Sequence, residues 1–111
     1  MIEKHIVINF DLGLRGDYNS LYIWLDTKNA MECGKATAAF AMNFSEDVFD
    51  TIYKELKMEL EKEVHIEKND RVYMVATDES CRMQGAFLFG GRKKADWTGY
   101  KIINQNEPDK F

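Results

Sequence analysis

The chain of 111 residues has a single proline and no apolar run of the roughly 18 residues that a membrane-spanning helix needs. Its start, Met1 to His5, lacks the basic segment and apolar stretch of a secretory signal. These absences predict a soluble, cytoplasmic protein with no membrane partner. The composition, 45% hydrophobic and 31% charged, is typical of a folded chain and excludes a disordered or collagen-like one.

Positive charge is also scarce. Lys and Arg number 15 against 19 Asp and Glu, so the formal net charge is −4. Proteins that bind nucleic-acid backbones usually carry a net positive balance or a clear basic stripe. Here the overall field repels phosphate, so any such binding must depend on a local patch or on a metal ion.

Cysteine and histidine are equally sparse. Cys33 and Cys81 stand in no metal-ligand spacing, and without a secretory signal we expect two reduced, buried or structural thiols rather than one disulfide. His5 and His65 lie far apart and have no Ser or Cys partner in a suggestive spacing. The sequence therefore supports neither a nucleophilic triad nor a zinc site.

Hydrophobic patterning in the first third predicts a strand and then a helix. Residues 5–10 are rich in β-branched side chains, which favour a strand. Asp17 suits the N-cap of an amphipathic helix over residues 18–28, and Asn29 suits its end. We expect this helix to bury Tyr18, Leu21, Tyr22 and Leu25, with Trp24 at the border of that face.

The middle of the chain allows two interpretations. Residues 30–43 carry small side chains at both odd- and even-numbered positions, which would place them on both faces of a strand. This pattern predicts either one central strand or a hairpin that turns near Gly34 and Lys35. Ser45 is then expected to cap a long helix that runs to about Val64. The buried stripe of that helix is predicted to comprise Val48, Phe49, Ile52, Tyr53, Leu56 and Leu60.

Two further strands are predicted at residues 71–77 and 84–90. An apolar island over residues 97–103 could form a short fifth strand, and residues 104–111 are expected to be a flexible tail after a single domain, residues 1–103. This alternation predicts an antiparallel α+β sandwich of four or five strands with two helices on one face. Its order becomes ferredoxin-like if residues 30–43 form the hairpin.

Several short segments resemble a known family. A strand that ends Asn9-Phe10-Asp11-Leu12, then a glycine, then Asp17-Tyr18 and Leu21-Tyr22 at the start of a helix, is similar to the opening of the small ferredoxin-like CRISPR-associated nucleases. The same superfamily includes virulence-associated protein D and SinR-like proteins. Residues 69–75 resemble their polar turn and final core strand, and residues 85–89 with Trp97 resemble their C-terminal portion.

The resemblance implies a homodimer whose two sheets pack together. An aspartate at the end of the first strand of each subunit would hold Mg²⁺ or Mn²⁺ near the dimer axis, and the matching residue is Asp11. This chain departs from the family in two ways. Where SinR-like members carry a tryptophan and a Ser-Thr pair, only Thr37 corresponds, and the net charge is negative where nucleic-acid-binding members would show a basic face.

Three groups of residues are candidates for chemistry. Asp11 either holds a divalent cation, which could activate a water for phosphodiester hydrolysis, or bonds the backbone of the turn at Gly13. Arg15, between Gly13 and Gly16, either holds an anion near a helix N-terminus or lies in a plain strand-to-helix turn. The third group either binds nucleic acid through cations and a stacking aromatic or forms a solvated loop; its members are Arg92, Lys93, Lys94 and Trp97.

Two functions remain open at this stage. The first is a dimeric, metal-dependent nuclease that acts on RNA or DNA, with Asp11 as the catalytic metal ligand. The second is a non-catalytic dimer that binds a protein partner, in the manner of an inhibitor or antitoxin. Asp11 carboxylates that converge across a dimer axis would distinguish the nuclease from the binding module.

Overall fold

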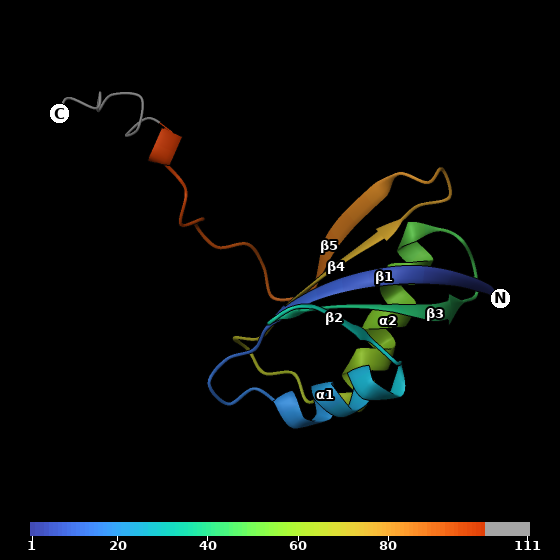
Figure 1. Ribbon diagram of the computed structural model, residues 1–111, viewed down its shortest axis with the longest axis horizontal. Coiled ribbons are helices and arrows are strands. Elements are labelled where there is room, and N and C mark those ends of the chain that lie inside the picture. The colour runs from blue at the N-terminus through green and yellow to red at the C-terminus, as the bar shows by residue number, and fades with distance from the viewer. Residues whose placement is uncertain (102–111) are drawn as a thin grey trace.

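The computed structural model describes residues 1–101 (Figure 1). Its elements, in chain order, are β1 (Ile2–Asp11), α1 (Tyr18–Thr27), β2 (Met31–Gly34), β3 (Thr37–Phe44), α2 (Phe49–Glu63), β4 (Arg71–Thr77) and β5 (Met83–Phe89). The strands form one open sheet of order β2-β3-β1-β4-β5 in which every neighbouring pair is antiparallel. This is the α+β, ferredoxin-like arrangement that the sequence predicted, with β5 added beside β4.

The hairpin interpretation of residues 30–43 is confirmed. β2 ends at Gly34 and β3 begins at Thr37, so the turn falls at Lys35 and Ala36. Gly34 has a φ of 148°, which a residue with a side chain rarely adopts. Because the hairpin supplies two strands between the helices, β1 is left in the centre of the sheet, between β3 and β4.

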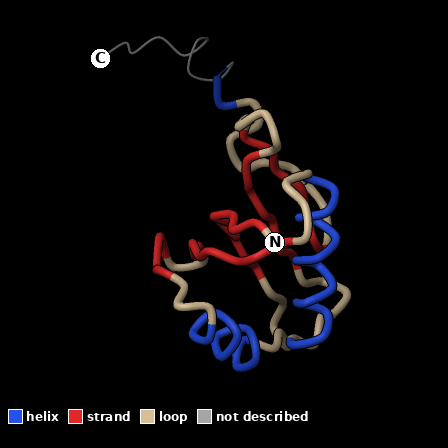
Figure 2. Tube along the Cα trace, turned by 90° about the vertical axis from the view of Figure 1, so that its right-hand side faces the viewer, coloured by secondary structure: helices blue, strands red, loops and turns tan. Residues whose placement is uncertain are grey.

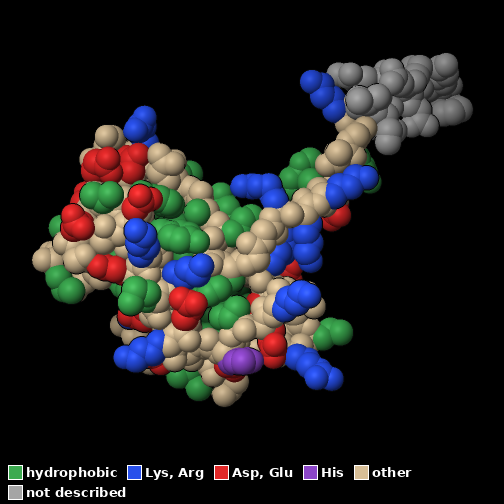
Figure 3. Space-filling view, turned by 180° about the vertical axis from the view of Figure 1, so that it is seen from behind, with side chains coloured by type: hydrophobic (Ala, Val, Ile, Leu, Met, Phe, Trp, Pro, Cys, Tyr) green, Lys and Arg blue, Asp and Glu red, His purple; other side chains and the backbone are tan. Residues whose placement is uncertain are grey.

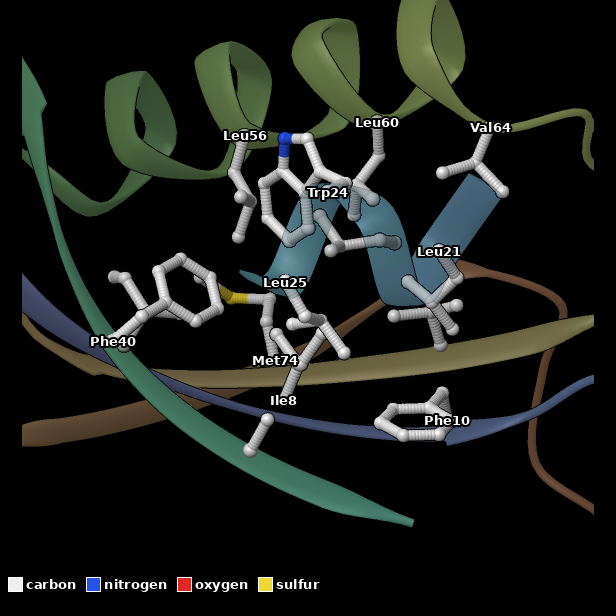
Figure 4. Close-up of a cluster of buried hydrophobic side chains, with 14 of the residues drawn as sticks. Ile8, Phe10, Leu21, Trp24, Leu25, Phe40, Leu56, Leu60, Val64 and Met74 are labelled. Atoms are coloured by element: carbon white, nitrogen blue, oxygen red, sulfur yellow. The ribbon is translucent and has the colours of Figure 1, made fainter. Parts of the chain in front are cut away.

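Both helices lie on the same side of the sheet (Figure 2). β1 shows this in its alternation: Ile6, Ile8 and Phe10 are buried, whereas Asn9 and Asp11 are exposed on the opposite face. Figure 4 shows Leu56 and Leu60 of α2 pointing toward Trp24 of α1 above the strands. The largest fully buried side chains between these layers include Phe44, Ile6, Ile8, Leu21, Ile52, Leu56, Leu60, Met74 and Leu88.

α1 begins and ends as predicted but buries a different face. Asp17 caps it by accepting a hydrogen bond from the backbone N–H of Ser20 at 3.1 Å, and Asn29 after its end has a φ of 54°. The prediction that Tyr22 is buried is wrong, since Tyr22 is 52% exposed while Trp24 is only 4% exposed. Trp24 packs in the core against Phe40, with ring centroids 5.1 Å apart, and its indole Nε1–H is satisfied by donating to Glu59 of α2 at 2.7 Å.

α2 starts later than the sequence suggested. Val48 precedes its first turn and makes no side-chain cap, so the prediction that Ser45 caps this helix is wrong. The hydroxyl and the backbone N–H of Ser45 donate instead to Glu55, in the second turn of α2, and lower the pKa of that carboxyl. Val48 is 40% exposed and does not belong to the buried stripe, whereas Ile52 is fully buried as predicted.

The strand predicted over residues 71–77 is β4, and β5 lies one residue earlier than predicted. Residues 96–101 form a turn and the start of a helical turn. The additional short strand predicted over residues 97–103 therefore does not form within 97–101. Residues 102–103 and the predicted tail, 104–111, lie outside the described residues. Cys33 and Cys81 are free, as expected, but both are exposed rather than buried. No helix within residues 1–101 is long and apolar enough to span a membrane.

Candidate functional site

The face of the sheet opposite the helices carries its side chains in rows, because paired residues of neighbouring strands point the same way. One row is apolar across all five strands and comprises Met31, Ala39, Val7, Val75 and Gly85. The next row, toward the end of β1, comprises Thr37, Asn9, Tyr73 and Phe87. The pair Asp11 and Arg71 follows at the end of β1. The open face therefore changes from apolar to aromatic and charged along β1.

Arg71 and Asp11 are sixty residues apart in sequence and opposite each other in the sheet. Arg71 Nη2 donates to Asp11 Oδ2 at 2.9 Å, and the Asp11 side chain remains 60% exposed. The Nε–H of Arg71 is buried and has no acceptor within residues 1–101. A buried donor without an acceptor is unfavourable by about 1–3 kcal/mol. The Arg71 side chain as a whole is 26% exposed, so a ligand in the groove would meet its exposed atoms rather than the buried Nε.

Asp11 does not hold the turn that follows it, which was one of its two predicted roles. The backbone N–H of Gly13 donates instead to Asp70 Oδ1 at 2.8 Å. Asp70 is 1% exposed and accepts a second backbone hydrogen bond, from Glu67, at 2.7 Å. Because Asp70 ties both loops together, Asp11 and its neighbour Arg71 are held at the same end of the sheet.

An aromatic corner lies beside this ion pair. The rings of Tyr73 and Phe87 have centroids 4.9 Å apart and an interplanar angle of 71°. Tyr73 lies directly over Gly85, where the Cβ of any other residue would collide with the ring. The guanidinium of Arg92 lies over both rings, 5.9 Å from the Tyr73 centroid and 5.5 Å from that of Phe87.

Three adjoining hollows form one surface feature, which we call the strand-end groove. The central hollow, about 320 Å³, is lined by Asn9, Asp11, Arg71, Tyr73, Phe87 and Arg92. A hollow of about 480 Å³ shares Asp11 and Arg71 with it and extends to Tyr22 and Lys35. A third, of about 500 Å³, shares Arg71 and Arg92 and extends to Lys93, Lys94 and Trp97. Asp11 thus lies in the middle of the groove.

The strand-end groove is basic although the chain is acidic. Five cationic side chains line it, against two carboxylates, Asp11 and Asp96. Residues 90–101, which we call the C-terminal arm, project away from the sheet (Figure 1) and leave Trp97 77% exposed. Figure 3 shows Lys and Arg side chains gathered along the arm and where it leaves the body. This is the local basic patch that phosphate binding requires in an acidic protein.

Most of the residues predicted from the sequence meet in this groove. Asp11 and the four candidates of the arm all line it, whereas Arg15 is exposed in the loop before α1 and lines none of the three hollows. Sequence analysis missed Arg71, Tyr73 and Phe87. The alternation of the strand at 71–77 could have shown that Arg71 and Tyr73 share a face, but it could not show that Asp11 lies opposite them.

The described part of one chain does not form a metal site by itself. Within residues 1–101 no three His, Cys, Asp or Glu side chains lie close enough together to bind an ion. Mg²⁺ is usually held by one or two carboxylates with several waters, but one oxygen of the Asp11 carboxylate is already bonded to Arg71. A second Asp11 carboxylate, from another copy of the chain, would be needed to complete the set.

Comparisons with protein-family models, with curated proteins and with solved structures give no significant match for this chain. The family resemblance seen in the sequence therefore remains a prediction. The strand-end groove itself is the feature that bears on function.

Proposed function

We propose that this protein binds single-stranded nucleic acid in the strand-end groove. One observation carries the proposal: five cationic side chains and the aromatic side chains of Tyr73, Phe87 and Trp97 line the same groove. Cations attract the phosphates of the backbone, and aromatic faces stack on unpaired bases. The bases of a duplex are already stacked and paired, so a single strand is the expected ligand.

The fold and the position of Arg71 both support this proposal. RNA-recognition domains use an open sheet whose aromatic side chains stack two or three bases, and here Tyr73 and Phe87 lie on the open face of β4 and β5. Arg71 lines all three hollows and its side chain is 26% exposed, so the exposed part of its guanidinium would donate to a phosphate oxygen. Arginine suits this role because its planar donors match phosphate oxygens in pairs.

A homodimer is the second part of the proposal. The apolar row that crosses the open face includes Val7, 39% exposed, and Met31, 66% exposed, and packing against the same row of another copy would bury them. Val7→Asp should give a monomer in size-exclusion chromatography with light scattering. Ile23→Asp is the matched control, since Ile23 is 58% exposed on α1, outside this row. A wild-type protein that remains monomeric at high concentration would contradict the dimer.

Metal-dependent cleavage of the bound strand is a second candidate function. It is favoured by the position of Asp11, an exposed carboxylate in the middle of a basic groove. It also requires the dimer, because residues 1–101 of one chain do not bring together the ligands of a metal ion. Binding and cleavage make opposite predictions for Asp11→Asn, which removes a negative charge from the groove and also removes the metal ligand.

Binding is tested by fluorescence anisotropy with labelled single-stranded RNA, single-stranded DNA and duplex DNA across a salt series. We expect both single strands to bind more tightly than the duplex. Arg71→Ala should weaken binding and reduce the salt dependence by about 0.7 log units per log unit of salt, the effect of one lost phosphate contact. Lys54→Ala, which removes an exposed cation of α2 outside the groove, is the matched control.

Cleavage is tested with the same labelled strands in Mg²⁺, in Mn²⁺ and in EDTA. Asp11→Asn should bind at least as tightly as the wild type, because a repulsive charge is removed, and should lose any metal-dependent cleavage. Binding without cleavage in the wild type would leave a non-catalytic nucleic-acid-binding protein. Failure of every strand to bind at low salt would refute the proposal and favour a protein partner instead.

A further inference from the structure

Arg92 is held by aromatic rings rather than by an acid. Its guanidinium lies 5.5 Å and 5.9 Å from the centroids of Phe87 and Tyr73. No carboxylate within residues 1–101 forms an ion pair with it. A guanidinium over ring faces keeps its charge and its hydrogen-bond donors available to a ligand.

The support beneath Arg92 is firmly held. Phe87 and Tyr73 are paired residues of neighbouring strands, both partly buried, and Tyr73 lies against the backbone of Gly85. Arg92 itself is exposed and lines both the central hollow and the hollow that extends to Trp97. One side of the guanidinium therefore faces the aromatic corner, and the group borders open space in the groove.

We infer that Arg92 is a stacking platform on which one unpaired base of the bound strand lies. This inference rests on the proposed binding of single-stranded nucleic acid. A guanidinium is planar and stacks on a base in the same way as an aromatic ring, and the two rings beneath Arg92 would support it while the base lies on its open side. Arg71, Lys93 and Lys94 line the same groove and would contact the phosphates on either side.

The platform gives the groove a property that charge alone does not give. A groove of cations binds any polyanion, whereas a planar platform favours a strand that carries bases over the same backbone without them. Lysine at position 92 would keep the positive charge but has no plane, so Arg92→Lys separates the two contributions. Lys54→Arg is the matched control, since it exchanges the same two residue types on α2, outside the groove.

The experiment measures binding of two fluorescein-labelled eight-nucleotide DNA strands of equal charge, one of adenine nucleotides and one of abasic tetrahydrofuran nucleotides. We expect the wild type to bind the adenine strand about tenfold more tightly, the effect of one stacked base. Arg92→Lys should bind the abasic strand as the wild type does and should show a smaller preference for adenine. Lys54→Arg should keep the wild-type preference.

Each outcome decides one of the two proposals. Equal binding of both strands by the wild type would overturn the stacking role of Arg92 and leave the proposed nucleic-acid binding intact. A preference that is undiminished in Arg92→Lys would likewise overturn the platform and place the base elsewhere, for example on Trp97. Failure of both strands to bind would refute the proposed function and this inference together.

Discussion

Replacing Asp70 with alanine should strongly destabilise the protein. Asp70 is 1% exposed and accepts two backbone hydrogen bonds, from Gly13 at 2.8 Å and from Glu67 at 2.7 Å. Alanine leaves both donors without this acceptor, at about 1–2 kcal/mol each, so we expect the free energy of unfolding to fall by about 2–4 kcal/mol. For a domain of this size that corresponds to a decrease in Tm of about 8–16 °C.

The assay is urea denaturation followed by circular dichroism, with the slope of the transition as a check on two-state behaviour. Asp26→Ala is the matched control, because Asp26 is exposed on α1, and its effect should stay within about 0.5 kcal/mol. The loss of unfolding free energy in Asp70→Asn should lie between those of Asp70→Ala and Asp26→Ala. The single oxygen of the amide can replace only one of the two carboxylate oxygens that accept hydrogen bonds. A loss below about 1 kcal/mol for Asp70→Ala would refute the assignment of Asp70 as the tie between the two loops.

Three further results are expected. Gly85→Ala should place a Cβ against the Tyr73 ring, lower the free energy of unfolding by about 1–3 kcal/mol and change the near-ultraviolet circular dichroism. Trp24→Phe removes the hydrogen bond to Glu59 and should lower the free energy of unfolding by about 1–2 kcal/mol in the same urea assay. An unchanged free energy of unfolding would contradict the role of the indole as a donor to Glu59. Hydrogen bonds from the Gln84 amide and then from the backbone of Arg82 lower the pKa of Asp78 in the folded state. The stability from Asp78 is therefore present at neutral pH and lost as the pH falls through the lowered value. The difference in free energy of unfolding between Asp78→Asn and the wild type should therefore decrease toward zero in that acidic range. A difference that stays constant with pH would contradict this.

The order of the elements could be predicted from local pattern. The strand at 71–77, the helix that begins after Asp17 and the turn near Gly34 depend on residues close together in sequence. The errors arose where distant residues decide the outcome. Ser45 resembles a helix cap, but its hydrogen bonds go to Glu55. Trp24 packs against Phe40, and Glu59, 35 residues away, accepts the hydrogen bond of its N–H.

The candidate site was only partly predictable for the same reason. Asp11 ends a strand and the cations at 92–94 form a run, so both stand out in the sequence. Arg71 acquires its role only from the pairing of β1 with β4, which brings it to Asp11 across sixty residues. Phe87 likewise becomes part of an aromatic corner only when β5 pairs with β4. No local pattern contains either pairing.

The central position of β1 has a consequence for how the protein is synthesised. Ile8 pairs with Ala38 on one side and with Met74 on the other, so β1 has both of its neighbours only after β4 has been made. At about 5–20 residues per second, the ribosome needs roughly 3–13 seconds to proceed from Ile8 to Met74. During that interval an apolar strand is without its final partners, and closing the long loops between them slows folding further. β1 carries the charged residues Glu3 and Lys4 at its start. Charged side chains on an unpaired strand discourage its pairing with other chains.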